Sequence, residues 1–373
     1  VERMRYEQHE MQRVRVSQLS AGMIPARNVF SADGRMLLAA DKEITESYIR
    51  RLQEMEVYAI YVRNPLFDNV EVPLVVSEET RNQSMQSVKR AFEVLRGKRQ
   101  DVSFDAIQGV ARRIVAEVLR NRRALVHLTE IRTHDDYTFA HSVDVCGLSV
   151  LVATHLGYNE VRLQELAVGA LLHDVGKTKV DAALLNKQTA LDDDEMAMMR
   201  SHTMFGFDIL RCSKGKLTLP SIHIALQHHE KYDGSGYPRG LSKDEIHEYS
   251  RIVSIADVYD AITSDRPYRK ALEPYEAYEL MLVNGSQHFD PQVLPVFLKR
   301  IAIYPVGTVV RLNTGDIGVV VSVPPEMPLR PTLRLIMDKQ RRLYPGEIEF
   351  DMQNHLTSFV DQVVDGRDLL KLI

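Results

Sequence analysis

The sequence predicts a mainly α protein, in which an all-helical central region lies between a small α/β unit and a small β-rich unit. Apolar residues recur at helical spacing through the central region, whereas short β-branched runs bounded by turn signals lie on both sides. The chain has 373 residues, more than one compact core usually needs. We therefore expect three parts, at residues 1–70, 71–302 and 303–373.

The N-terminal unit is expected to contain three strands, at residues 26–30, 35–40 and 57–62. Asp33-Gly34 supplies a turn between the first two strands. Thr45 precedes the amphipathic stretch SYIRRLQEM and marks the start of a helix. Because no cluster of chemically reactive residues occurs here, we expect a folding or regulatory module.

The central region shows the helical period most clearly. Val88, Phe92 and Leu95 share one helix face, and the stretch from Ile107 to Val118 repeats the same spacing. Glycine and proline fall mainly at the junctions between such stretches. The region is long enough to enclose one sizeable core.

The C-terminal region changes to β-branched runs. VGTVVRL (306–312) and IGVVVSV (317–323) are joined by a hairpin signal at residues 313–316. TLRLIMD (332–338) predicts a third strand. These strands predict a small β-barrel or meander.

Composition excludes some classes of protein. Lys plus Arg total 47 against 51 Asp plus Glu, a net charge of −4, which does not favour binding of DNA or RNA polymers. The two cysteines, Cys146 and Cys212, lie in apolar stretches and predict no disulfide framework, so we expect a cytoplasmic protein. No apolar run approaches the roughly 20 residues that span a bilayer.

Histidines and carboxylates follow several apolar runs. His173-Asp174 follows AVGALL, and His228-His229 follows PSIHIALQ. Adjacent buried His and Asp side chains need partners, and a divalent cation is an economical one. Asp257 lies in a further apolar helix.

The glycine-rich segment after His229 predicts a turn. Two consecutive histidines at a helix end point about 100° apart, so both reach one ion only where the chain turns. Gly234, Gly236 and Pro238 supply that turn and are expected to shape the loop. His141 and His202, from two further helices, complete the candidate metal set.

Three segments together resemble the HD-GYP family of the HD phosphohydrolase superfamily: HDVGK (173–177), HHEKYDGSGYP (228–238) and ADVYDAITSDRPYRK (256–270). The resemblance covers about residues 125–300 and implies an HD-type helical bundle. It also implies that Asp174 bridges two metal ions. The other ligands fall into two sets: His141, His173 and Asp257 on one ion, and His202, His228 and His229 on the other.

The ligand types bear on the metals. Five imidazole nitrogens with two carboxylates favour Fe or Mn, with Ni, Co or Zn as alternatives, over Mg. Some family members carry a Glu four residues before the first ligand histidine, where it helps to hold a third metal. Tyr137 occupies that position here. We therefore expect two ions per chain.

The resemblance implies hydrolysis of cyclic di-GMP to pGpG, and onward to GMP, by hydroxide held at the metals, in bacterial signalling. Asp174 and Lys177 are the expected catalytic residues, with Lys177 near the phosphate. The expected substrate contacts are Arg266, Arg269, Lys270, Tyr237 and Asp135. Arginine suits both phosphate and guanine, through forked hydrogen bonds and stacking.

Three alternatives remain open from the sequence. The substrate could be another cyclic dinucleotide, such as a cyclic GMP-AMP, because the motifs do not determine base selectivity. A general HD nucleotide phosphohydrolase would leave the segment 228–238 unexplained. A catalytically weak sensor of the nucleotide should have lost ligands, and all are present. A homodimer, and protein partners that bind the Gly-Tyr-Pro loop, are compatible with each reading.

Overall fold

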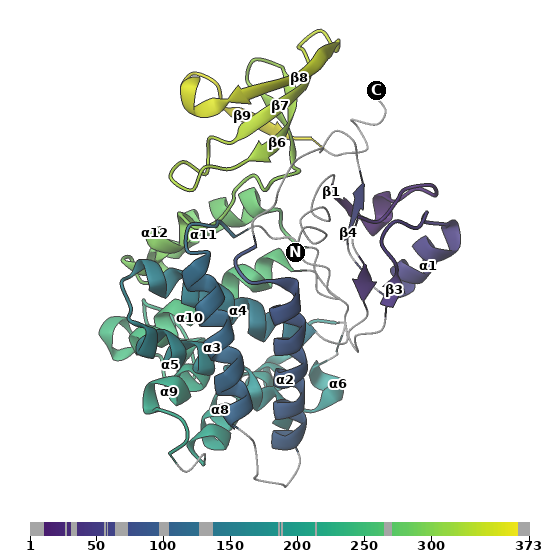
Figure 1. Cartoon of the computed structure of the whole chain (residues 1–373). Coiled ribbons are helices and arrows are strands. Elements are labelled where there is room, and N and C mark those ends of the chain that lie inside the picture. The colour runs from purple at the N-terminus through teal and green to yellow at the C-terminus, as the bar shows by residue number, and fades with distance from the viewer. Residues whose placement is uncertain are drawn as a thin grey trace. The chain divides into compact units, whose positions relative to one another are not determined.

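The computed structural model divides the chain into two compact units (Figure 1). One consists of Val75–Ala124 and Tyr137–Arg300, and the other contains the N- and C-terminal segments. The structure describes residues 11–26, 28–30, 36–55, 57, 59–63, 74–96, 104–126, 137–185, 187, 189–212, 215–264 and 271–364.

The first unit is helical, which confirms the predicted mainly α fold class. Its helices are α2 (Glu78–Arg96), α3 (Phe104–Arg120), α4 (Tyr137–His155), α5 (Glu160–Leu171), α6 (Ala182–Leu185), α7 (Asp193–Arg200), α8 (His202–Arg211), α9 (Leu219–Gln227), α10 (Glu248–Thr263), α11 (Pro274–His288) and α12 (Val293–Leu298). A 3-10 helix, η4 (Val175–Lys179), follows α5.

Helix α4 lies at the centre of this unit. It packs against α2, α3, α5, α10 and α12, and residues around its whole circumference are buried, including Val145, Leu151 and Val152. A helix that is apolar all round belongs in a core. Arg81 on α2 binds both carboxylate oxygens of Asp144 on α4, at 2.8 and 2.9 Å, in a forked pair that joins the two helices.

A glycine allows η4 and α8 to touch through their backbones. A Cβ atom at Gly176 would lie 1.8 Å from the carbonyl oxygen of His202 and 2.5 Å from the amide nitrogen of Gly206. No side chain fits at this position. The turn that carries His173 and Asp174 is therefore held directly against the start of α8.

The N-terminal segment contains one helix and short antiparallel strand pairs. Thr45 caps α1 as predicted, because its hydroxyl accepts a hydrogen bond from the amide of Tyr48. Val14 pairs with Ile60 across the sheet, in a strand that the sequence analysis did not predict. The predicted turn at Asp33-Gly34 lies outside the described residues. The elements are β1 (Met11–Arg15), β2 (Val29–Phe30), β3 (Met36–Leu38), α1 (Glu46–Glu54) and β4 (Ala59–Arg63).

The C-terminal segment is a five-stranded antiparallel sheet of order β8-β7-β6-β5-β9. It contains the three predicted strands, and two more follow them. The predicted hairpin is present, because the amide of Leu312 donates to the carbonyl of Asp316 at 2.8 Å, with Gly315 at φ +91°. The strands are β5 (Val309–Leu312), β6 (Ile317–Ser322), β7 (Thr332–Met337), β8 (Leu343–Asp351) and β9 (Val360–Val363).

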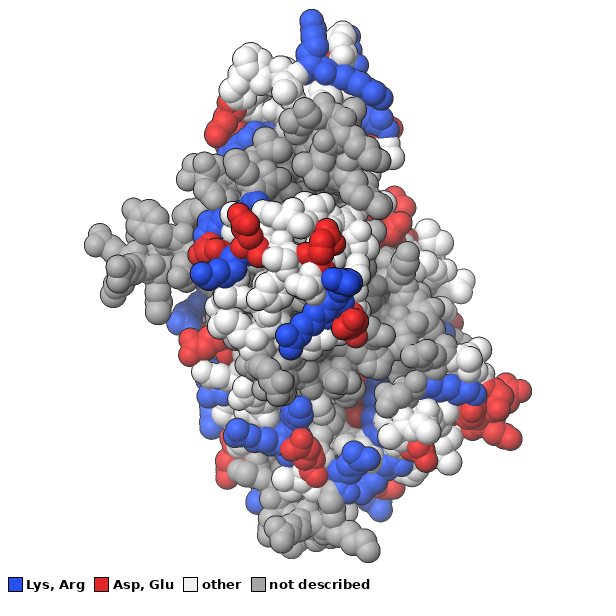
Figure 2. Space-filling model, turned by 90° about the vertical axis from the view of Figure 1, so that its right-hand side faces the viewer, with Lys and Arg blue, Asp and Glu red and all other residues white. Residues whose placement is uncertain are grey.

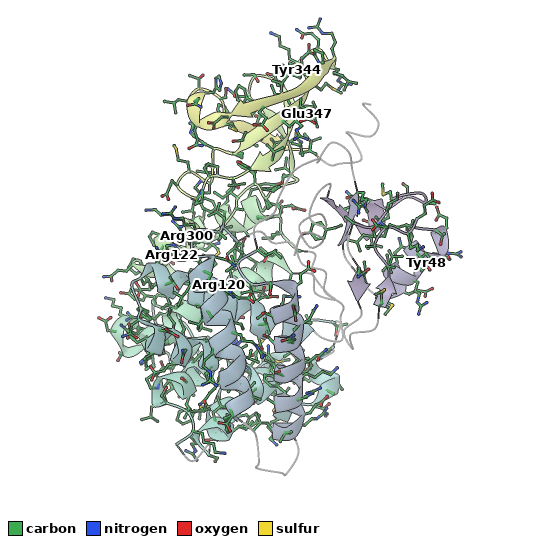
Figure 3. All side chains as sticks on the ribbon, in the orientation of Figure 1. Tyr48, Arg120, Arg122, Arg300, Tyr344 and Glu347 are labelled. Atoms are coloured by element: carbon green, nitrogen blue, oxygen red, sulfur yellow. The ribbon has the colours of Figure 1, made fainter. Side chains whose placement is uncertain are left out.

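Strand β8 pairs with β7, packs Tyr344 and Phe350 on the apolar core and makes polar side-chain contacts. Tyr344 and Glu347 lie on β8 (Figure 3). The hydroxyl of Tyr344 donates a hydrogen bond to Asp316 at 2.8 Å, and Oε2 of Glu347 lies 3.5 Å from Nη2 of Arg334 on β7. Most side chains of β8 are exposed. Pro345 and Gly346 lie inside the strand, and both residue types are rare in strand interiors, which explains why β8 was not predicted.

The described surface is mixed in charge. Basic and acidic side chains are interspersed on the face shown in Figure 2, in keeping with the small net charge of −4. In the part of the chain that the structure describes, no helix combines the length and the apolar character needed to cross a membrane.

Candidate metal centre

The candidate ligands come from five separate segments of the helical unit. His141 lies in the second turn of α4, His202 begins α8, His228 caps the C-terminus of α9, and Asp257 lies within α10. The pair His173-Asp174 was expected near a helix end. Helix α5 ends at Leu171, so the pair occupies the turn between α5 and η4. All these side chains are buried except that of His229, which is partly exposed.

The carboxylate of Asp174 lies between two pairs of histidines. Its Oδ1 is 3.5 Å from Nε2 of His202 and 3.8 Å from Nε2 of His228. Its Oδ2 is 3.4 Å from Nε2 of His173 and 3.8 Å from Nε2 of His141. Each oxygen therefore faces a different pair of imidazoles.

The carboxylate of Asp257 also faces two histidines. Its Oδ1 lies 3.0 Å from Nε2 of His141, and its Oδ2 lies 3.7 Å from Nδ1 of His229. The structure thus brings together all seven side chains that the sequence analysis named as metal ligands.

Backbone carbonyls orient three of the imidazoles. Nδ1 of His173 lies 2.7 Å from the carbonyl of Ala170, and Nδ1 of His202 lies 2.7 Å from that of Met199. Nδ1 of His228 similarly lies 3.0 Å from the carbonyl of Ile224. A carbonyl only accepts, so we assign the proton of each neutral ring to Nδ1. The lone pair on each Nε2 then points into the cluster.

Asp260 orients the fourth imidazole and was missed in the sequence. Nδ1 of His141 lies 2.7 Å from Oδ2 of Asp260, and both residues are buried. A carboxylate behind a ligand histidine fixes the ring and makes it more basic. The available signal was the spacing of Asp257 and Asp260, which share one face of α10 at i and i+3.

The histidines differ in their pKa values. Burial lowers the pKa of His202, drives that of His228 well below its usual value, and lowers that of His229 to about 3. Burial also disfavours the charged form of His141, but Asp257 and Asp260 outweigh it and raise its pKa to about 9.

The two carboxyl groups stay ionised despite their burial. Burial alone would raise the pKa of Asp174, yet Lys177 and the histidines hold it well below the usual range. His141 and His229 do the same for Asp257. Ionised carboxylates are the form that binds a cation.

The residues of the cluster fit a metal ion. Nε2 of His173 and Oδ1 of Asp174 are buried and have no hydrogen-bond partner in the part of the chain that the structure describes, an arrangement that costs stability unless something binds there. Ligand atoms within 4.8 Å of one another form two groups, His141–His173–Asp174 and His202–His228–His229. Imidazole nitrogens with carboxylate oxygens suit transition metals. The cluster can therefore bind metal ions.

The loop after His229 is built around a buried carboxylate. Glu230 accepts hydrogen bonds from the amides of Arg239 at 2.8 Å and Leu241 at 3.0 Å, which closes the loop. A Cβ atom at Gly236 would lie 2.3 Å from the amide nitrogen of Lys231, so only glycine fits there.

Two further features complete the loop. Gly234 has φ +85°, and the peptide bond from Tyr237 to Pro238 is cis. The ring of Tyr237 stacks on that of His229, with centroids 4.8 Å apart. The loop thus brings the tyrosine ring against the cluster.

The structure describes only some of the remaining residues predicted for the site. Nζ of Lys177, on η4, lies 2.5 Å from Oδ2 of Asp174, and its side chain is 26% exposed. Tyr137 begins α4, but its side chain is not described. Four expected substrate contacts lie outside the described residues: Asp135, Arg266, Arg269 and Lys270.

Comparison with known families identifies the helical region. Residues 116–293 match the HD domain family. The helical region is an HD domain. Residues 309–372 match the KOW domain associated with HD domains, a relationship that the sequence analysis did not recognise. The resemblance to the HD-GYP family is confirmed by these matches together with the similar proteins described next.

Several curated proteins are similar to the chain. A cyclic di-GMP phosphodiesterase of Pseudomonas aeruginosa is 39% identical over 230 residues, 62% of this chain and 55% of that protein. A cyclic di-GMP phosphodiesterase of Thermotoga maritima is 37% identical over 49% of this chain and 48% of that protein. A 3'3'-cGAMP-specific phosphodiesterase of Vibrio cholerae is 36% identical over 45% of this chain and 36% of that protein. The chain spans about half the length of the first two.

A solved structure has the same fold. Bd1817, an HDG"Y"P protein from Bdellovibrio bacteriovorus, superimposes with a TM-score of 0.50 at 19% identity. The match covers 77% of this chain and 98% of that one. It supports the HD-type arrangement of the helices.

Proposed function

We propose that this chain is a metal-dependent phosphodiesterase that hydrolyses a cyclic dinucleotide, with cyclic di-GMP as the preferred candidate. The observation that carries the proposal is the position of Asp174, whose two oxygens face two different histidine pairs in a buried cluster. The names of the similar proteins from Pseudomonas and Thermotoga support the choice of substrate.

Two divalent ions, Fe or Mn by preference, would be held by the seven side chains. Asp174 would bridge them. His141, His173 and Asp257 would complete one site, and His202, His228 and His229 the other. When bound, such ions supply an activated water and Lewis acidity at the phosphate. The orphaned atoms on His173 and Asp174 support this occupancy.

The residues of the chain then have distinct roles. Asp174 and the backbone-held imidazoles present fixed ligand atoms, so little reorganisation is needed when substrate arrives. Lys177 keeps its ammonium group beside Asp174 while part of its side chain reaches solvent. It would donate a hydrogen bond to a phosphate oxygen as negative charge develops there. Arg266, Arg269, Lys270 and Asp135 would contact the phosphates and guanine bases, on the strength of the family resemblance.

The second candidate substrate is a cyclic GMP-AMP. It is favoured by the similarity to the Vibrio cholerae enzyme, whose name specifies 3'3'-cGAMP. The first product from cyclic di-GMP would be linear pGpG, and a second cleavage would give GMP.

The proposal is tested by metal removal and reconstitution. Chelator-treated protein should lose activity and regain it with Mn²⁺ or Fe²⁺ more than with Mg²⁺. Chromatography of parallel reactions with cyclic di-GMP and 3'3'-cGAMP identifies the substrate and the product. Undiminished turnover by fully metal-free protein would refute the mechanism.

A further inference from the structure

Three side chains form a stack that leads from the metal cluster to the surface. The ring of Tyr237 lies on the ring of His229, with centroids 4.8 Å apart and planes inclined by 28°. The guanidinium carbon of Arg200 lies 5.1 Å from the centroid of Tyr237. Arg200 is the last residue of α7 and is exposed.

The guanidinium of Arg200 has no carboxylate partner among the described residues. The exposed arginine at the end of the next helix, Arg211, pairs with Asp208 at 3.2 Å. Lys177, a cation beside the cluster, is already 2.5 Å from Asp174. Among the described residues no carboxylate offsets the positive charge of Arg200, and only the ring of Tyr237 separates its guanidinium from His229, a candidate metal ligand.

A contact with a tyrosine ring leaves most of the hydrogen-bonding capacity of an arginine unused. The guanidinium has five N–H donors, and the ring uses its flat face rather than those donors. Such an arginine is preorganised to bind an oxyanion in a forked geometry. The ring holds the side chain in place, so less rotamer freedom is lost on binding.

The chemistry of the proposed substrate gives a cation at such a position a use. A cyclic dinucleotide has two phosphodiesters, and only one of them can react at the metals at a time. The other keeps its negative charge and must be held away from the ions. A cation that lies outside the metal cluster, as Arg200 does beyond Tyr237, is suited to that phosphate.

We propose that Arg200 binds the non-reacting phosphate of the cyclic dinucleotide and that Tyr237 positions it. This inference rests on the proposed function, since it assigns a substrate contact within the same site. It adds a cation from α7 to those expected from the segment 256–270, and it gives the tyrosine of the Gly-Tyr-Pro loop a positioning role.

The experiment compares two substrates in four variants. Arg200→Ala removes the side chain, Arg200→Met keeps an apolar stem against Tyr237, and Arg200→Lys keeps the charge without the fork. Arg211→Ala is the matched control, an exposed arginine at the end of α8. Each metal-loaded protein is assayed for metal content, for binding of cyclic di-GMP, and for kcat and KM with cyclic di-GMP and with bis(p-nitrophenyl) phosphate, which has one phosphate.

Arg200→Ala and Arg200→Met should weaken binding of cyclic di-GMP and raise its KM roughly ten- to a hundredfold, the loss typical of one charge-assisted contact. Metal content, and the rates with bis(p-nitrophenyl) phosphate, should match wild type. Arg200→Lys should recover part of the loss, and Arg211→Ala should resemble wild type.

Two results would overturn the inference. If Arg200→Met binds and cuts cyclic di-GMP like wild type, the arginine only packs on Tyr237. If the Arg200 variants lose activity equally with both substrates, the effect is on the metal site. A wild-type protein that binds cyclic di-GMP without cutting it would instead refute the proposed enzyme. The effect of the Arg200 variants on binding of cyclic di-GMP would then decide the role of Arg200. A wild type that does not bind cyclic di-GMP would refute both.

Discussion

The two halves of the histidine cluster are built from similar ligands but differ in their surroundings. The acidic half, His141, His173 and Asp257, has a second carboxylate behind it in Asp260. The neutral half, His202, His228 and His229, has Asp174 as its shared carboxylate, and main-chain carbonyls hold two of its rings. The pKa of His141 is accordingly raised to about 9, whereas that of His229 is lowered to about 3.

This difference predicts how each half takes up a metal. A ligand imidazole must be neutral to bind. At pH 7 the histidines of the neutral half are uncharged, because burial lowers their pKa values, so this half is ready for an ion. In the acidic half, His141 keeps a proton until an ion displaces it. The acidic half should therefore depend on pH and on Asp260, and the neutral half on neither.

We expect the largest loss of activity from a change at Asp174, which lies between the two halves. Asp174→Ala should deplete both ions and reduce turnover by about a thousandfold or more, because this one carboxylate is proposed to serve both sites. The helices should remain folded, since the core around them is already apolar. Metal analysis and circular dichroism measure the two outcomes. A variant with normal metal content and rate would show that Asp174 is only structural.

Asp260→Ala should separate the two halves. We expect about a ten- to hundredfold loss of metal affinity at the acidic half, the usual effect of removing a partner behind a ligand histidine, with the neutral half unchanged. Stepwise titration with Mn²⁺ resolves the two affinities. Asp260→Asn, which keeps an acceptor oxygen, is the matched control and should lose less. Equal losses at both halves would contradict the assignment.

The dependence on pH is a smaller and graded effect. Below pH 9 the proton on His141 competes with the metal, so affinity at the acidic half should rise by about tenfold per pH unit from 7 toward 9 and then level off. Affinity at the neutral half should change little over this range, because its histidines are already neutral. Titrations at three pH values test this. If metal affinity rose with pH by the same slope at both halves, the two halves would not differ in the way proposed.

The smallest expected change concerns Tyr137. Wild type should hold about two ions per chain, and Tyr137→Glu, one helical turn before His141, should add a third, weaker site next to the acidic half. Metal analysis of both proteins is the measurement. Three well-occupied ions in the unchanged protein would refute the reasoning from the missing carboxylate.

The sequence was most informative about the candidate metal ligands, which lie in or next to apolar segments. All seven proposed ligands lie in one buried cluster because each is attached to a segment whose apolar face must enter the core. Asp260 was missed because its partner, His141, is 119 residues away, and only the packing of α4 on α10 shows the contact. Glu230 was seen as part of a motif, but its role in closing the loop depends on backbone amides that no side-chain pattern reveals.

The flanking units were harder to predict for physical reasons. Strands β5, β6 and β7 have buried β-branched runs, and the sequence shows them. Strand β8 contains Pro345 and Gly346, and β9 has only four residues, so both give a weak sequence signal, although backbone hydrogen bonds form the strands. Strand β1 also gives a weak signal, because its sequence MQRVR is largely polar.

The spacing between the two proposed metal sites depends on the absence of a side chain at Gly176. Gly176 lets the backbone of η4 rest on the carbonyl of His202, the residue that begins α8 and belongs to the neutral half. The turn with Asp174 and the helix with His202 therefore share one rigid junction. A single methyl group at Gly176 would force these segments apart, and Asp174 would then lose the position from which it is proposed to bridge two ions. Catalysis by a pair of metals would thus be tuned by the smallest side chain in the motif HDVGK.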